Sequence, residues 1–255
     1  MLQKYLPLLR EEHAIDFVIA NYENASHGFG LTEKNCLELL ECGVDMMTGG
    51  NHSFDKKEVL TLFDKYPLIR PANYPKSTPG TGVYEVEVNG VQLAVVNILG
   101  HYTMPMVDNP FTVADGIVES LVQKNIKHIV IDMHAEATSE KQALLHILGD
   151  KVSAIVGTHT HVSTDDLQIV KGCCYITDLG LTGCRDGVIG MDPASPIKRF
   201  MTGIGSHFDV PDHCKSISHI LLVDLDKEGK SLEAKKLKIY DDGSIVVTHA
   251  KKEID

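Results

Sequence analysis

The chain has 255 residues with 24 Lys or Arg and 35 Asp or Glu, which gives a formal net charge of −11. Apolar residues make up 43% and charged residues 23%, a balance that is typical of a folded globular protein and excludes a disordered one. The length suits one hydrophobic core, so we expect a single domain over residues 1–255. The acidic charge argues against a strong nucleic-acid footprint, unless metal cations supply the positive charge.

The start of the chain and its cysteines indicate the cellular compartment in which we expect the protein. The first ten residues carry charges and contain no small-residue cleavage site, so they do not resemble a signal peptide. No apolar run reaches the roughly 18 residues that a membrane helix needs. The 6 cysteines show no C-x-x-C spacing, and a domain of this size needs no disulfides. We therefore expect a cytoplasmic protein with reduced thiols and no membrane segment.

Short apolar runs alternate with helical patterns up to about residue 172, which indicates an α/β architecture. The predicted strands in this part cover residues 15–20, 44–47, 83–88, 93–99, 126–133 and 152–156. Asn89-Gly90 predicts a hairpin turn between the third and the fourth of them. Helix starts are expected at Thr32, at Asp55 with Glu58, at Thr112 with Asp115, and at Thr138 or Ser139. Gly43 and Gly149 would end the first and last of these helices.

The later part of the chain reads as strands and turns. Strands are expected over residues 175–179, 220–225, 237–240 and 245–248. Asp242-Gly243 predicts a hairpin turn between the last two.

Four predicted strands end in side chains that can bind metal ions. In chain order these side chains are Glu23 and Asn24, Asn51 and His52, His134, and His159 and His161. Ligands bind beyond the carboxyl ends of the strands in open α/β sheets, so we expect the four groups to converge at one edge. The pattern predicts a dinuclear metal site.

His159 and His161 give the sharpest single signal. In an extended segment both imidazoles would lie on one face, with Thr158 and Thr160 on the other. Each group also has an alternative role. His159 and His161 could be an exposed or hydrogen-bonded pair, and Glu23 and Asn24 could form a turn that enters a helix. Asn51 could make an Asx turn and the histidine at 134 a strand-end turn. Because these alternatives require four coincidences at one sheet edge, we favour the metal site.

Several segments carry a family resemblance. They are residues 21–30 (N-Y-E-N-A-S-H-G-F-G), 50–55 (G-N-H-S-F-D), 70–75 (R-P-A-N-Y-P), 132–141 (D-M-H-A-E-A-T-S-E-K), 157–162 (G-T-H-T-H-V), 175–191 and 199–203. In this order they resemble the YmdB-like family of calcineurin-type metallophosphodiesterases. The resemblance implies a four-layer α/β/β/α sandwich, a centre of two metal ions and hydrolysis of cyclic nucleotides, with 2',3'-cyclic nucleoside monophosphates as the best-described substrates. It also implies a homo-oligomer, since family members commonly assemble.

The resemblance also assigns roles to residues. Glu23 is similar to the carboxylate shared by both metals, Asn24 and His161 to ligands of the first metal, and Asn51, His134 and His159 to ligands of the second. His52 is similar to the proton donor of the family. Imidazole, carboxylate and amide ligands without a thiolate suit iron or manganese, and also zinc.

The sequence departs from the family pattern at its beginning. The family opens with a strand that ends in an Asp-x-Val-Gly turn, whose Asp is a ligand of the first metal, whereas this sequence starts within the helix that should follow. Either translation begins upstream of Met1 or the strand is missing. In the second case we expect weak metal binding and an unpaired gap in the sheet.

The favoured function is hydrolysis of a cyclic phosphodiester with two metal ions, in which His52 donates a proton to the departing ribose oxygen. One alternative is a general metallophosphatase that acts on other phosphate esters. Another is a regulator that keeps the fold and binds a nucleotide or a protein but has lost the first metal.

Overall fold

The computed structural model describes residues 1–252. The helices in this range are α1 (Leu2–Glu12), α2 (Glu33–Glu41), α3 (Val59–Leu62), α4 (Pro110–Gln123), α5 (Thr138–Leu148) and α6 (Ala194–Thr202). The strands are β1 (Ile19–Asn21), β2 (Met46–Thr48), β3 (Val83–Val88), β4 (Val91–Leu99), β5 (His128–His134), β6 (Ala154–Thr158), β7 (Gln168–Val170), β8 (Cys173–Ile176), β9 (Thr182–Cys184), β10 (Ser216–Leu225), β11 (Ser231–Tyr240), β12 (Ile245–His249) and β13 (Lys251–Lys252).

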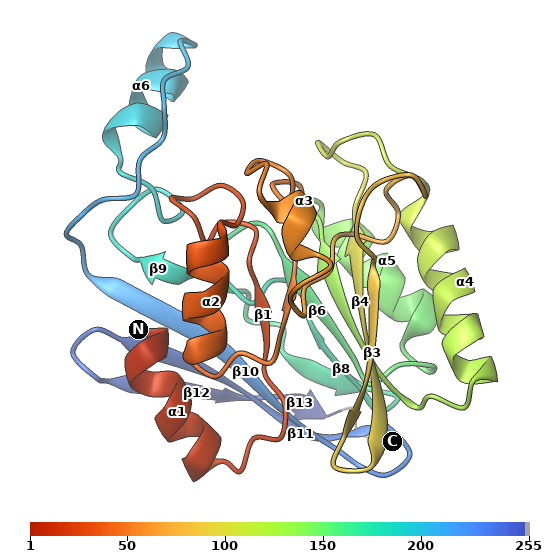
Figure 1. Ribbon diagram of the computed structural model, residues 1–255. Coiled ribbons are helices and arrows are strands. Elements are labelled where there is room, and N and C mark those ends of the chain that lie inside the picture. The colour runs from red at the N-terminus through yellow and green to blue at the C-terminus, as the bar shows by residue number, and fades with distance from the viewer. Residues whose placement is uncertain (253–255) are drawn as a thin grey trace.

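Two β-layers lie face to face between helices (Figure 1). One layer is a 7-stranded sheet with the order β13-β7-β8-β6-β5-β4-β3. The other contains the β1-β2 pair and the 4-stranded sheet β12-β11-β10-β9. Helices α4 and α5 pack on the first layer, while α1 and α2 pack on the second. The fold is therefore the four-layer α/β/β/α sandwich that the sequence led us to expect.

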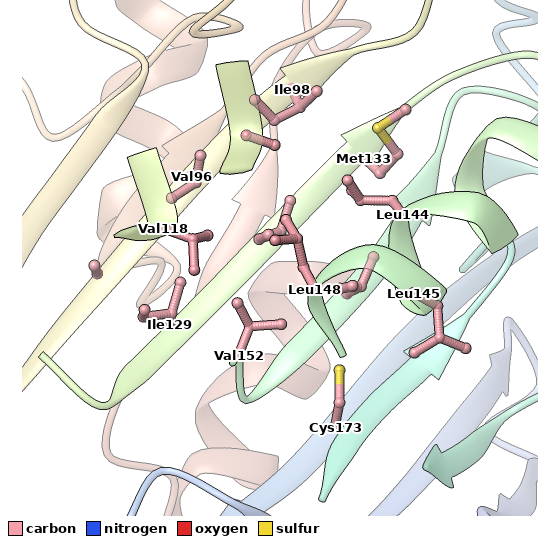
Figure 2. Packing of buried hydrophobic residues seen from close by; sticks show 14 of the residues in the cluster. Val96, Ile98, Val118, Ile129, Met133, Leu144, Leu145, Leu148, Val152 and Cys173 are labelled. Carbon is pink, nitrogen blue, oxygen red and sulfur yellow. The ribbon is translucent and has the colours of Figure 1, made fainter. Parts of the chain in front are cut away.

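The largest core cluster lies between the 7-stranded sheet and helices α4 and α5 (Figure 2). Ile129 and Met133 of β5 face Val118 of α4 and Leu144 of α5, and all four are fully buried. Burying each such side chain contributes about 1.5–3 kcal/mol. Because strand side chains alternate, the residues between them on β5 face the other β-layer. This alternation turns the last polar residues of β5 toward the centre of the sandwich.

Most predicted strands are confirmed, with ends shifted by a few residues. The hairpin turns at Asn89-Gly90 and at Asp242-Gly243 join β3 to β4 and β11 to β12. Thr32 caps α2, since its side chain accepts a hydrogen bond from the backbone N–H of Asn35. The sequence thus predicted these turns and this helix cap correctly, because each of them depends only on neighbouring residues.

Two predicted helix starts were wrong. Helix α3 begins at Val59, and the Asp55 carboxylate binds the ring of His52 instead of capping the helix. Helix α4 begins at Pro110 rather than at Thr112, because the Asn109 side chain accepts from the backbone N–H groups that follow. A capping residue directly before a proline is a stronger start signal than the capping box that we favoured.

A gap separates β1 from β10 within the second layer. Among the described residues, β1 pairs only with β2, and β9 covers no more of β10 than residues 216–218. The unpaired edges of both strands line one cavity of about 1410 Å³, whose floor includes apolar residues of β4, β5 and β6. Within residues 1–252, β1 and β10 therefore belong to separate sheets that face the same cavity.

Two further expectations concern the cysteines and membrane-spanning helices. All 6 cysteines are free thiols, and 5 of them are buried. Among the described residues no helix has the length and apolar character needed to cross a membrane.

Candidate metal centre

Four of the predicted ligands meet at the Nε2 atom of His134, which ends β5. Asn51 Oδ1, from the loop after β2, lies 2.8 Å away. His159 Nδ1, which follows β6, lies 3.1 Å away, and the carboxylate Oε2 of Glu23, which follows β1, lies 3.2 Å away. The carboxyl ends of four strands thus bring together side chains that lie far apart in the sequence, as predicted.

The other two predicted ligands form a second pair. His161 Nε2 lies 3.0 Å from the amide oxygen of Asn24. The Asn24 amide N–H donates to the carbonyl of Gly28 at 2.7 Å, which turns its oxygen toward the imidazole. His161 Nδ1 is 2.8 Å from the carbonyl of Ile189, an acceptor to which an Nδ1–H can donate. In that tautomer of the neutral ring, Nε2 directs its lone pair toward the side of Asn24.

The predicted geometry of the histidine pair was wrong. β6 ends at Thr158, and His159 and His161 have positive φ angles of 101° and 62°, so they do not lie on one face of an extended segment. Thr158 does not point away from the site but contacts the ring of His134. A polar contact bends the chain here: the backbone N–H of Thr160 donates to the Asp178 carboxylate at 2.9 Å.

The support beneath this bend could not be predicted from the sequence. The Asp178 carboxylate also accepts from Lys141 Nζ at 2.9 Å, and both side chains are completely buried. A buried ion pair of this kind holds its geometry because either partner alone would be an uncompensated charge. The burial of Lys141 could not be predicted from the sequence, since a lysine on a helix is usually exposed.

His52 lies at the edge of the cluster. Its backbone N–H donates to the Glu23 carboxylate at 3.2 Å. Its ring Nδ1 is 2.8 Å from the Asp55 carboxylate, and the ring meets Phe29 edge-on with centroids 5.0 Å apart. The contact with Asp55, which sequence reasoning missed, orients the ring, with Nδ1–H donating to the carboxylate.

Burial and neighbouring charges set the protonation of the cluster. Burial works against the charge of Glu23, but the His134 ring and the His52 N–H outweigh it and lower the pKa of Glu23 to about 2. Burial, reinforced by His134, lowers the pKa of His159 to about 4. Glu23 is therefore ionised and His159 neutral near pH 7, which are the forms that bind metal ions.

His134 itself is pulled in two directions. Burial disfavours its charged form, but the nearby carboxylates of Glu23 and Asp132 prevail and raise the pKa of His134. The ring is 1% exposed and sits where a cation would be stabilised by both carboxylates. The cluster thus attracts positive charge.

A glycine makes room for the cluster. A Cβ atom added to Gly50 would lie 2.2 Å from Glu23 Oε2 and 2.6 Å from His134 Nε2. One ligand atom each from Glu23, His134 and His159 already lie within 4.8 Å of one another. Two imidazoles, a carboxylate and an amide oxygen in this space fit a first-row metal ion.

The layered sandwich, together with this cluster at the strand ends, defines a protein of the metallophosphoesterase type. The chain belongs to the YmdB-like protein family, whose model matches residues 1–237. It is 44% identical over 244 residues to the 2',3'-cyclic-nucleotide 2'-phosphodiesterase of Bacillus subtilis (strain 168), covering 95% of this chain and 92% of that protein.

Two crystal structures have the same fold. A hypothetical protein from Thermus thermophilus aligns with a TM-score of 0.86 at 36% identity, covering 98% of this chain and 93% of that one. A phosphatase from Mycoplasma pneumoniae aligns with a TM-score of 0.87 at 33% identity, covering 94% of this chain and 87% of that one. The likeness extends over nearly the full length of each chain.

Proposed function

We propose that this protein is a metal-dependent phosphodiesterase that hydrolyses cyclic nucleotides, with 2',3'-cyclic nucleoside monophosphates as its substrates and two metal ions as its cofactors. The observation that carries the proposal is the meeting of Glu23, Asn51 and His159 at the Nε2 atom of the buried His134. The 44% identity to a 2',3'-cyclic-nucleotide 2'-phosphodiesterase supports the substrate class.

Each predicted ligand has a place in this proposal. Asn51, His134 and His159 would hold one metal ion, Asn24 and His161 the other, and Glu23 would be shared. Bound cations would neutralise the phosphate and act as Lewis acids, with iron or manganese preferred and zinc also suited. This positive charge would let a chain with net charge −11 bind an anionic substrate.

His52 is proposed as the general acid. Asp55 holds its Nδ1 at 2.8 Å, so the opposite nitrogen, Nε2, is the atom that would deliver a proton. That proton would go to the ribose oxygen as its bond to phosphorus breaks, which avoids an alkoxide leaving group. The side chain is 30% exposed, so it can exchange protons with solvent between turnovers.

Turnover of three substrates tests the proposal. The protein loaded with manganese should hydrolyse 2',3'-cyclic AMP faster than 3',5'-cyclic AMP and p-nitrophenyl phosphate. His134→Ala should abolish the reaction, because it removes the nitrogen at which the other ligands meet. Equal rates on all three substrates would instead favour a general metallophosphatase. Nucleotide binding without hydrolysis would favour a regulator.

A further inference from the structure

Asp132 is a buried carboxylate behind the proposed metal ligands. It is 6% exposed, and its three partners are uncharged groups. Oδ2 accepts from the Thr48 hydroxyl at 2.5 Å and from the Asn21 amide at 3.0 Å. Oδ1 accepts from the Thr158 hydroxyl at 2.6 Å. Burying a carboxylate is costly, so its retention here calls for an explanation beyond packing.

The strand register places this carboxylate next to His134. Asp132 and His134 are two residues apart on β5, so their side chains share one face. Thr158 of β6 stands directly opposite His134 in the parallel pair. Its hydroxyl oxygen lies 2.6 Å from Asp132 Oδ1 and 2.9 Å from His134 Nδ1. The three groups form a chain that ends at the imidazole.

The single proton of the Thr158 hydroxyl sets the direction of these hydrogen bonds. A threonine hydroxyl has one proton, and here it donates that proton to the carboxylate of Asp132. It must therefore accept a hydrogen bond from His134, which requires the proton on Nδ1. In the neutral ring the lone pair then lies on Nε2, the atom that faces Asn51, Glu23 and His159.

The opposite tautomer is a real competitor. With its proton on Nε2, the ring could donate to Asn51 Oδ1 at 2.8 Å or to Glu23 Oε2 at 3.2 Å. That proton would occupy the position from which a metal ion has to be bound. The hydroxyl at Nδ1 opposes this arrangement.

We propose that Thr158 and Asp132 are positioning residues that hold the His134 ring in its Nδ1–H tautomer and so keep Nε2 available to a metal ion. This inference rests on the proposed function, because it assigns the two residues to the same metal site. Hydrogen-bonded partners behind a metal-binding histidine typically change metal affinity or activity by about 10–100-fold when they are removed.

Three threonine variants separate positioning from packing. Thr158→Val keeps the shape of the side chain but removes the hydroxyl, and Thr158→Ser restores it. Thr48→Val is the matched control, since it removes another hydroxyl from Asp132 without touching His134. The affinity of each chelator-treated protein for Mn²⁺ is measured by titration calorimetry. Exchange of the His134 Nδ1 proton is followed by NMR in the Zn²⁺-loaded proteins.

We expect Thr158→Val to bind Mn²⁺ about 10–100-fold more weakly and to exchange the Nδ1 proton faster, while Thr158→Ser and Thr48→Val stay close to the wild type. Wild-type affinity and exchange in Thr158→Val would overturn the proposal, as would an equal loss of affinity in Thr48→Val. If circular dichroism shows that Thr158→Val does not fold, Asp132→Asn replaces it, with weaker Mn²⁺ binding expected and unchanged binding overturning the proposal.

These measurements use no nucleotide. A wild type that binds Mn²⁺ but leaves 2',3'-cyclic AMP intact would refute the proposed function, while the threonine variants would still decide the role of Thr158 and Asp132. A wild type that binds none of Mn²⁺, Zn²⁺ and Fe²⁺ would overturn both.

Discussion

Adding one methyl group to Gly50 should weaken metal binding without replacing any of the proposed ligands. The new Cβ atom would lie 2.2 Å from Glu23 Oε2 and 2.5 Å from His134 Cε1, whereas ordinary contact begins at 3.4 Å. The carboxylate must therefore retreat by about 1.2 Å, or the backbone must move by the same amount. Crowding of this kind costs about 1–3 kcal/mol of stability.

The larger effect of Gly50→Ala falls on metal binding. A misplacement of about 1 Å in a functional cluster costs roughly 100-fold, or about 3 kcal/mol. We expect that loss in the affinity of chelator-treated Gly50→Ala for Mn²⁺, measured by titration calorimetry, with urea unfolding of the metal-free protein as the measure of stability.

Gly116 provides the control. A Cβ atom there meets no atom within 4 Å, and the residue lies inside α4. Gly116→Ala should stabilise the helix by about 0.5–1 kcal/mol and leave Mn²⁺ affinity unchanged. If Gly50→Ala binds Mn²⁺ as tightly as the wild type, this prediction is wrong, since the ligands would then have room that the structure does not give them.

Three further predictions concern the proton donor, the buried ion pair and pH. His52→Ala should keep its metal ions but lose about 10²–10⁴-fold in kcat on 2',3'-cyclic AMP, and loss of metal by elemental analysis would show it to be a ligand instead. Lys141→Met leaves the Asp178 carboxylate buried without its cation and should lower the free energy of unfolding in urea by about 3–5 kcal/mol, so wild-type stability would contradict the role of the pair. The pKa of His159 falls from 6.5 to about 4 on folding, so between these values the unfolded metal-free chain binds a proton that the folded one does not, and stability declines as pH falls. The stability of the wild type relative to His159→Gln should therefore decrease from about pH 7 to about pH 5, and a constant difference would refute this.

The sequence predicted the strand ends well because the signal there is local. An apolar run that is followed directly by His134, or within a few residues by Asn51, marks a strand that stops where its side chains become polar. The carboxyl ends of such strands meet at one edge whatever the order of the strands. The meeting of four ligand segments could therefore be expected without knowing the sheet topology.

The features of the site that could not be predicted from the sequence depend on long-range contacts. The bend at Thr160 is held by a carboxylate 18 residues further along the chain, and that carboxylate is held in turn by Lys141. Asp132 reads as an ordinary polar residue within a strand until the β5–β6 register places Thr158 opposite His134. Periodicity gives the face on which a side chain lies but not the partner that faces it.

The proposed function requires that Glu23, Asn51, His134 and His159 build a metal centre that hydrolyses a cyclic phosphodiester. Its most direct test is the rate of 2',3'-cyclic AMP hydrolysis before and after chelator treatment, followed by stepwise addition of Mn²⁺. We predict that turnover disappears on chelation and returns with added Mn²⁺. Turnover that survives complete removal of metal would contradict metal-dependent hydrolysis at this site.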